Sequence, residues 1–287
     1  MDTLTVRDPE MVYGVTPREF ADDPVIGGSL SPTDVSNLLK APAIYYDHIS
    51  NPADTTTPDR EDDVNELLHA LLLDKPLDVQ VIYHDSYRTK AARAERDLAR
   101  KSGVLPVLEV DVVKVEAILD NAFSNPNIGK MLLGEGEVDV GLFSPDPRTG
   151  VWFRSLVDKM IKDESGKVTL IKLVTGIDSD PVAFSQLVAK RKYYLDSYIS
   201  RNLYKWLVDE KADVQYVFVA VGKDSPNLTS INMLTPEYDG VARREVDRAV
   251  VAYQDSLKSG MWEGYGGEVH MVTPPDLLLE NTENPDD

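Results

Sequence analysis

Residues 138–175 read VDVGLFSPDPRTGVWFRSLVDKMIKDESGKVTLIKLVT, and this stretch decides the fold. Three runs within it are rich in β-branched, aromatic and other apolar residues, at 138–143, 151–160 and 168–175, which is typical of strands. Turn-forming residues separate the runs, with Pro145, Pro147 and Gly150 in the first gap and Gly166 in the second. The stretch therefore predicts three consecutive strands joined by two hairpins.

Helical periodicity predicts the elements on either side of these strands. Ser31 is the expected N-cap of a helix that has Pro32 in its first turn and ends at Ala41. Further helices are expected at 64–73, 86–102, 109–133, 181–210 and 237–259, and further strands at 216–221 and 231–234. We therefore predict an α/β fold with a mixed, largely antiparallel sheet flanked by helices and an N-terminal helical section.

Composition shifts suggest the boundaries of the folded part. Residues 1–28 are rich in Asp, Pro and Gly without a sustained period, which predicts an irregular arm. Residues 29–279 are expected to form a single domain, mainly helical over 29–133 and built on the sheet over 134–279 with its C-terminal helix. Residues 280–287 are expected to be a frayed acidic tail.

Charge and composition limit the classes of function. The formal charge is −19, from 49 acidic and 30 basic residues, which argues against broad electrostatic attraction to nucleic acid. The chain has no cysteine, so neither disulfides nor thiolate metal sites stabilise it. No apolar run approaches the roughly 20 residues that span a bilayer, and the N-terminus lacks a basic start followed by an apolar stretch. We expect a cytoplasmic protein without membrane contact.

Basic residues nevertheless gather at two places that could contact DNA. One cluster lies over 88–101 and the other over 190–201, and the candidate DNA-binding residues among them are Arg88, Lys90, Arg93, Lys190 and Lys192. The alternative is that these side chains form ordinary solvated helix faces.

Acidic residues on successive strands of the predicted hairpin are the candidate chemical site. Asp139 and Asp158 could together hold a hard divalent cation, which prefers oxygen ligands, and His69 could add a nitrogen ligand or orient a water. The alternatives are ordinary hairpin charges for the two carboxylates and a satisfied core histidine for His69.

Four motifs in a fixed order resemble one known family of nucleases. They are Leu30-Ser31-Pro32-Thr33-Asp34, Leu67-Leu68-His69-Ala70-Leu71-Leu72-Leu73-Asp74-Lys75-Pro76, Tyr87-Arg88-Thr89-Lys90-Ala91-Ala92 and Ser259-Gly260-Met261-Trp262-Glu263-Gly264-Tyr265. Together they resemble the RecE-like (exodeoxyribonuclease VIII type) branch of the PD-(D/E)XK nucleases, relatives of phage lambda exonuclease, from roughly Gly28 to Leu278. The resemblance implies a restriction-endonuclease-like fold and a phage or prophage protein that digests duplex DNA ends for recombination with Mg²⁺ or Mn²⁺. It also implies that the protein acts in the cytoplasm of a bacterial host cell.

The active-site pattern of that family matches this chain only in part. His69 and Asp158 match the family's histidine and first strand carboxylate, and Asp139 stands where a Glu is usual. The family's Asp-x-Lys-Thr strand reads Lys172-Leu173-Val174-Thr175, Asp196 replaces a Gln, and Gly222 stands where a Glu is common. A lysine in place of a ligand carboxylate moves the local charge by two units against a divalent ion, so the resemblance implies nuclease activity that is weak or lost.

Two readings of this altered site follow. In the first, Lys172 enters the metal position and pairs with Asp158 or Asp139 as an internal cation, and no metal cofactor is needed. In the second, a lysine from another element restores the site, from Lys159, Lys162, Lys190 or Lys192. The expected partners are duplex DNA ends or a recombination or replication protein, with self-assembly into a homo-oligomer as a further expectation. A catalytically inactive DNA-end-binding or protein-binding subunit is the alternative function.

Overall fold

The structure, a computed structural model, describes residues 4–51, 58–222 and 225–273. In that part of the chain one mixed sheet has the strand order β1-β4-β5-β6-β7-β8, and a smaller parallel sheet pairs β2 with β3. In the large sheet β6 and β7 run parallel, and the other neighbours are antiparallel. The strands are β1 (Glu10–Val12), β2 (Val79–Ile82), β3 (Leu105–Leu108), β4 (Glu137–Pro145), β5 (Trp152–Lys162), β6 (Val168–Thr175), β7 (Val214–Val221) and β8 (Thr229–Asn232). The predicted α/β class and the largely antiparallel sheet are confirmed.

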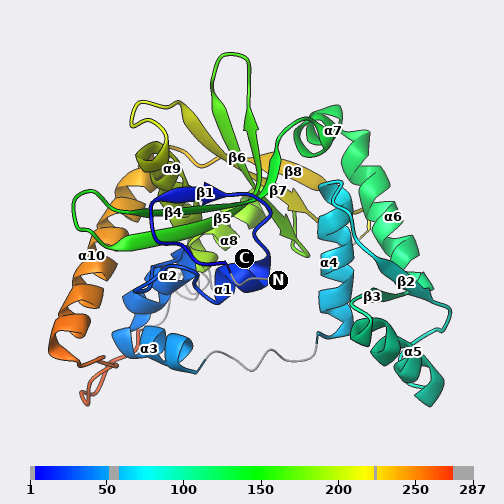
Figure 1. The fold of residues 1–287 in the computed structure, drawn as a ribbon, viewed down its shortest axis with the longest axis horizontal. Coiled ribbons are helices and arrows are strands. Elements are labelled where there is room, and N and C mark those ends of the chain that lie inside the picture. Colours follow the sequence, from blue (N-terminus) through cyan, green and yellow to red (C-terminus); the bar gives the residue numbers. More distant parts are fainter. Residues whose placement is uncertain (1–3, 52–57, 223–224, 274–287) are drawn as a thin grey trace, which may run out of the picture.

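Helices cover both faces of the large sheet (Figure 1). On one face α2, α3, α8, α9 and α10 pack with β4 to β7 in a first core. On the other face α4, α6 and α7 pack with β3, β6 and β7 in a second core. The helices are α1 (Pro17–Ala21), α2 (Pro32–Lys40), α3 (Pro42–Ser50), α4 (Arg60–Leu72), α5 (Lys90–Lys101), α6 (Glu109–Ser124), α7 (Pro126–Leu133), α8 (Pro181–Arg191), α9 (Tyr193–Leu207) and α10 (Glu237–Ser259). Within the described ranges, no helix combines the length and apolar character needed to cross a bilayer.

Local hydrogen bonds explain why the central hairpins form where the sequence predicts them. The Asp163 carboxylate accepts from the backbone N–H of Ser165 at 2.9 Å and of Lys167 at 3.0 Å, which closes the turn between β5 and β6. Gly166 there has φ of +87°, a conformation that favours glycine. The three predicted strands, β4, β5 and β6, are therefore confirmed.

Helix starts and breaks differ from the prediction in a few places. Ser31 caps α2 as expected, with its side chain accepting from the Asp34 N–H at 3.1 Å. The helix expected over 109–133 is two helices, because Pro126 cannot continue α6 and begins α7 instead. The helix expected over 181–210 is also two, since Lys192 adopts the left-handed conformation (φ +57°) between α8 and α9.

Other parts of the chain are more regular than their sequence indicated. The segment expected to be an irregular arm contains β1, which pairs with β4 at the sheet edge, and the capped helix α1. The parallel pair of β2 and β3 was not predicted, because each strand has only four residues. The expected acidic tail at 280–287 lies outside the described residues.

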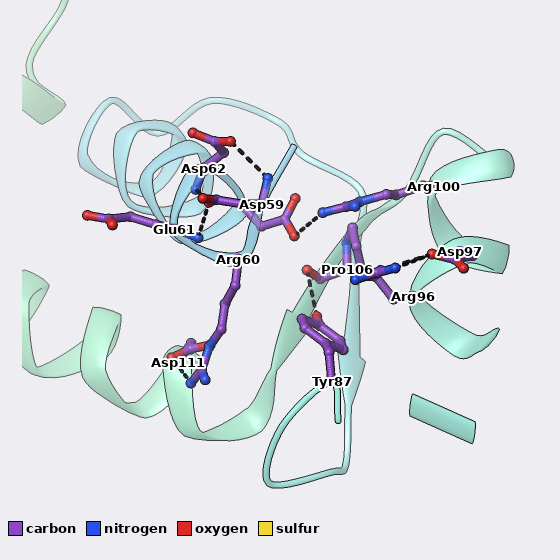
Figure 2. Close-up of polar contacts among 11 residues, drawn as sticks. Asp59, Arg60, Glu61, Asp62, Tyr87, Arg96, Asp97, Arg100, Pro106 and Asp111 are labelled. Atoms are coloured by element: carbon purple, nitrogen blue, oxygen red, sulfur yellow. Dashed lines mark hydrogen bonds and ion pairs between the residues drawn. The ribbon is translucent and has the colours of Figure 1, made fainter. Parts of the chain in front are cut away.

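Ion pairs hold the helical section around α4, α5 and α6 together (Figure 2). Arg60 donates two hydrogen bonds of 2.7 Å to the Asp111 carboxylate, and Arg100 donates one of 2.6 Å to Asp63. The Asp63 and Asp111 side chains are almost fully buried, so these contacts bridge elements that are distant in sequence. The basic helix therefore uses Arg100 internally, and that guanidinium is not available to a ligand.

Candidate functional site

The sheet divides between β5 and β6, and the predicted site residues lie where it divides. The two strands pair only over Lys159–Lys162 and Val168–Ile171. Beyond that point β5 stays paired with β4 while β6 stays paired with β7. Asp158 and Lys172 are the first residues past the paired region on each strand. Beyond the fork the facing backbone groups of β5 and β6 have no partner on the other strand, and the Leu173 N–H donates to the Asp158 side chain instead.

Asp139 of β4 lies beside the same fork, at a point where the side chains of β4 stop alternating regularly between the two faces of the sheet. Val138 pairs with Lys159 and Val140 with Val157, so Asp139 lies between two registered pairs, across from Asp158. Val140 belongs to the first core whereas Val138 packs against the second, although residues two apart normally share a face. Asp139 has φ of +52°, which accounts for the switch of face.

Asp158 has partners for both of its carboxylate oxygens. Oδ1 lies 3.4 Å from His69 Nε2 on α4, and Oδ2 accepts the Leu173 N–H at 2.6 Å. Burial would raise the pKa of Asp158, but the contact with His69, the Lys172 charge and the Leu173 N–H together hold it below its usual value. The carboxylate therefore stays ionised and bridges α4, β5 and β6.

Asp139 forms an ion pair with Lys75, which follows α4 in the chain. Both side chains are mostly buried, at 22% exposed for Lys75 and 11% for Asp139. The turn that places Lys75 is fixed by its N–H, which donates to the Ala70 carbonyl at 2.9 Å. One helix and its C-terminal turn therefore provide partners to both strand carboxylates. Lys75 was not singled out from the sequence, although it lies six residues after His69 in the same motif.

Lys172 pairs with Asp196 of α9, with its Nζ 3.6 Å from Oδ1. The expectation that it would pair with Asp158 or Asp139 is therefore wrong, although Asp158 remains a close negative charge. Burial would lower the pKa of Lys172, but Asp196 and Asp158 raise it above its usual value, so the side chain is an ammonium. Lys172 shares a strand face with Leu170 and Val174, and α9 covers this face, so its nearest carboxylate comes from the helix.

A buried polar layer supports this pair from α9. Ser200 donates its hydroxyl to the Asp196 carbonyl at 2.6 Å, and the hydroxyls of Ser200 and Ser155 lie 2.7 Å apart. Burial raises the pKa of Asp196, and the Lys172 charge opposes that rise. The carboxylate of Asp196 therefore depends on Lys172 for its charge compensation.

Two of the four lysines that were expected to be able to restore the site are engaged elsewhere in the structure. Val174 is buried in the first core. Lys159 donates to the carbonyls of Leu132 and Gly134 at 2.5 and 2.6 Å, where it caps the end of α7. Lys192 donates to both carboxylate oxygens of Glu245 at 2.8 Å. These contacts leave neither lysine directed at the fork.

The side chains at the fork do not offer the oxygen-rich set that Mg²⁺ or Mn²⁺ prefers. Asp139 is paired with Lys75, Asp158 contacts His69 with one oxygen and accepts the Leu173 N–H with the other, and Lys172 brings a positive charge to the same fork. Among the described residues, no group of three or more His, Asp or Glu side chains is close enough to hold a metal ion. The arrangement is suited to holding three elements together by charge rather than to activating a water.

The candidate DNA-binding residues fall into two groups that no described contact joins to the fork. Arg88, Lys90 and Arg93 are exposed around the start of α5, and Lys190 is exposed near the end of α8. Lys192 is engaged with Glu245 and Tyr194 and is not free. The free basic side chains of the predicted set therefore lie on the helical section and on the opposite side of the sheet.

Comparison with known proteins identifies the fold alone. No protein-family model matches the sequence, and no curated protein matches it. A solved structure from Eubacterium rectale, named a putative exonuclease, is similar over 94% of this chain and 97% of its own, with a TM-score of 0.58 and 10% sequence identity. The structure of SSO0001 is matched over 68% of this chain and 86% of its own at 15% identity, with a TM-score of 0.27 that supports no argument. The chain therefore has a nuclease-like fold.

Proposed function

We propose that the chain is a DNA-processing protein of the RecE-like exodeoxyribonuclease type that binds duplex DNA ends without hydrolysing them. The observation that carries this proposal is the 3.6 Å contact between Lys172 Nζ and Asp196 Oδ1, at the position where that family has a metal-ligand carboxylate. The nuclease-like fold and the order of the four motifs support the family, and phage-type recombination is the process that it serves.

Electrostatics at the fork favours binding without cleavage. A divalent ion would have to displace the Lys172 ammonium and compete with Lys75 for Asp139. The catalytic lysine position is a buried valine, which cannot stabilise charge on a scissile phosphate. Loss of one such electrostatic group lowers a rate by about 10²- to 10³-fold, and loss of a metal ligand adds to that.

Exposed cations on α5 support the DNA-binding part of the proposal. Arg88, Lys90 and Arg93 are exposed close together in sequence, and none of them is needed for the ion pairs that hold this section. Three phosphate contacts predict a dependence of log K on log salt with a slope of about −3. The net charge of −19 restricts such binding to a local surface.

The test combines a cleavage assay with a binding assay on the same end-labelled linear duplex. The wild type and Asp158→Ala are incubated with Mg²⁺ and with Mn²⁺, and fluorescence anisotropy measures binding as salt is raised. We expect salt-dependent binding and no shortening of the duplex by either protein. Metal-dependent shortening that Asp158→Ala abolishes would overturn the non-hydrolytic assignment, and absence of binding at low salt would overturn the DNA assignment.

The strongly acidic composition favours a second candidate, a protein-binding subunit on the same scaffold. An excess of 19 negative charges opposes nonspecific DNA contact but is compatible with a recombination or replication protein as partner, or with self-assembly. Co-purification with a basic partner protein, together with no duplex binding in the assay above, is the result that this candidate predicts.

A further inference from the structure

The loop between β2 and α5 carries the most exposed aromatic side chain of the described residues. Tyr83 follows β2 directly and is 74% exposed, compared with 67% for Tyr265 and 55% for Tyr13. Its ring therefore buries little surface in the fold and is open to a ligand.

The backbone around Tyr83 is anchored although its ring is exposed. The His84 N–H donates to the Ile82 carbonyl at 3.0 Å, which closes a three-residue turn centred on Tyr83. His84 Nε2 lies 3.1 Å from Glu95 Oε1, so the residue next to Tyr83 is tied to α5. An aromatic side chain on an anchored backbone loses little conformational entropy when it binds a ligand.

The second tyrosine of the same loop is used internally (Figure 2). The Tyr87 hydroxyl donates to the Pro106 carbonyl at 3.3 Å, and the Arg96 guanidinium lies 5.3 Å from the centroid of the Tyr87 ring. Within the described ranges Tyr83 has no comparable hydrogen bond or ring contact. The loop therefore has one tyrosine that supports the fold and one that faces solvent.

Cations lie at the other end of this loop. Arg88 and Lys90 are exposed, and neither forms an ion pair in the part of the chain that the structure describes. Residues 83–101 contain six basic residues and three acidic ones, namely Asp85, Glu95 and Asp97. Glu95 and Asp97 each contact a basic neighbour. This region is therefore locally positive in a chain of net charge −19, which suits it to phosphates.

Phosphate contacts alone do not distinguish a DNA end from the middle of a duplex, because both carry the same backbone. An aromatic ring can make that distinction. It stacks only on an open base face, and inside a duplex the neighbouring base pairs cover both faces of every base. Unpaired nucleotides present open faces, and stacking on them tolerates any sequence.

We propose that Tyr83 stacks on an unpaired base of a single-stranded overhang while Arg88 and Lys90 contact the phosphates beside it. The preferred ligand is then a duplex end that carries an overhang rather than a blunt end. This inference rests on the proposed binding of DNA ends and adds the structure of the end and the residue that reads it.

Fluorescence anisotropy on three labelled duplexes of one sequence tests the proposal with the full chain. The first duplex is blunt, the second has a short thymine overhang, and the third has an overhang of the same length made of abasic nucleotides. The abasic overhang keeps the added phosphates but removes the bases. We expect the wild type to bind the thymine overhang about tenfold more tightly than the abasic one.

Variants of Tyr83 assign that preference to the ring. Tyr83→Leu should lower the affinity for the thymine overhang to that for the abasic overhang and leave blunt-duplex binding unchanged. Tyr83→Trp keeps a stacking surface and should retain the preference. Tyr265→Leu is the matched control, because Tyr265 is 67% exposed but follows α10, and it should retain the preference as well. Circular dichroism verifies that the variants fold.

The outcomes separate this inference from the proposed function. Equal binding of the thymine and abasic overhangs by the wild type, with blunt-duplex binding intact, would overturn the role of Tyr83 and leave the DNA assignment in place. A preference that persists in Tyr83→Leu would also overturn it. Absence of binding to all three duplexes would overturn both proposals.

Discussion

Removal of the Lys172 charge is the sharpest test of the fork. Lys172→Met keeps the length of the side chain and its packing along β6, but it leaves Asp196 without its ammonium. Asp196 then lies close to Asp158 with no cation between them, and the two carboxylates repel each other. We expect the variant to fold with lower stability and Asp196→Asn to lose a similar amount.

The size of the effect follows from the distance and the burial. Two unit charges 3.6 Å apart attract by about 4.6 kcal/mol at an effective dielectric constant of about 20. The two side chains are 26% and 20% exposed, so solvent and the desolvation of both groups reduce the net interaction. We expect each single variant to lose about 2–3 kcal/mol and the double variant to lose less than the sum of the two.

Urea unfolding followed by circular dichroism measures the free energy of unfolding of the wild type, Lys172→Met, Asp196→Asn and the double variant, which together form a double-mutant cycle. The expected coupling free energy is about 2 kcal/mol. Arg243→Met is a matched control, because Arg243 pairs with Asp247 at 3.9 Å on the exposed surface of α10. It should change stability by less than about 0.5 kcal/mol. A Lys172–Asp196 coupling no larger than the control's effect would refute the assignment of an internal cation at the fork.

Further predictions address the same site and the DNA surface. Lys172→Asp combined with Val174→Lys and Asp196→Gln rebuilds the family's pattern and should confer Mg²⁺ binding by calorimetry, whereas Val174→Lys alone should not. The pKa of Asp158 is lower in the folded protein than its usual value of 3.8. The carboxylate therefore stabilises the folded state at pH values above 3.8, and this contribution is lost as the pH falls through the lowered pKa of the folded state. Asp158→Asn should therefore flatten the acid side of the stability profile between about pH 5 and pH 2. Arg88→Ser with Arg93→Ser should reduce the salt slope of duplex binding by about 2, whereas Lys258→Ser on α10 should leave it unchanged.

Short sequence motifs predicted the nuclease-like fold, although no protein-family model matches the sequence. The helix that carries His69 and the strand that carries Asp158 were both located from the sequence, and the structure brings their side chains to 3.4 Å. The DNA or protein partners stay predictions. The match at 10% identity reports the shape of the chain and not its chemistry.

Local sequence determined the elements of this protein. Apolar runs bounded by turn formers defined β4, β5 and β6, and a capping serine followed by proline defined the start of α2, because these signals act between residues close in the chain. Pro126 likewise ends α6, and that break was missed only because the apolar period continues across it. Elements without strong local signals, such as the short strands β2 and β3, were not found.

Tertiary structure alone decided how the charges pair. Lys172 faces Asp196 rather than Asp158, because α9 packs over the strand face that carries Lys172. Lys75 reaches Asp139 because α4 ends above the point where β4 changes face. Which carboxylate meets which cation depends on the packing of helices against a divided sheet, because Lys172 and Asp196, like Lys75 and Asp139, are far apart in the chain and only that packing brings them into contact.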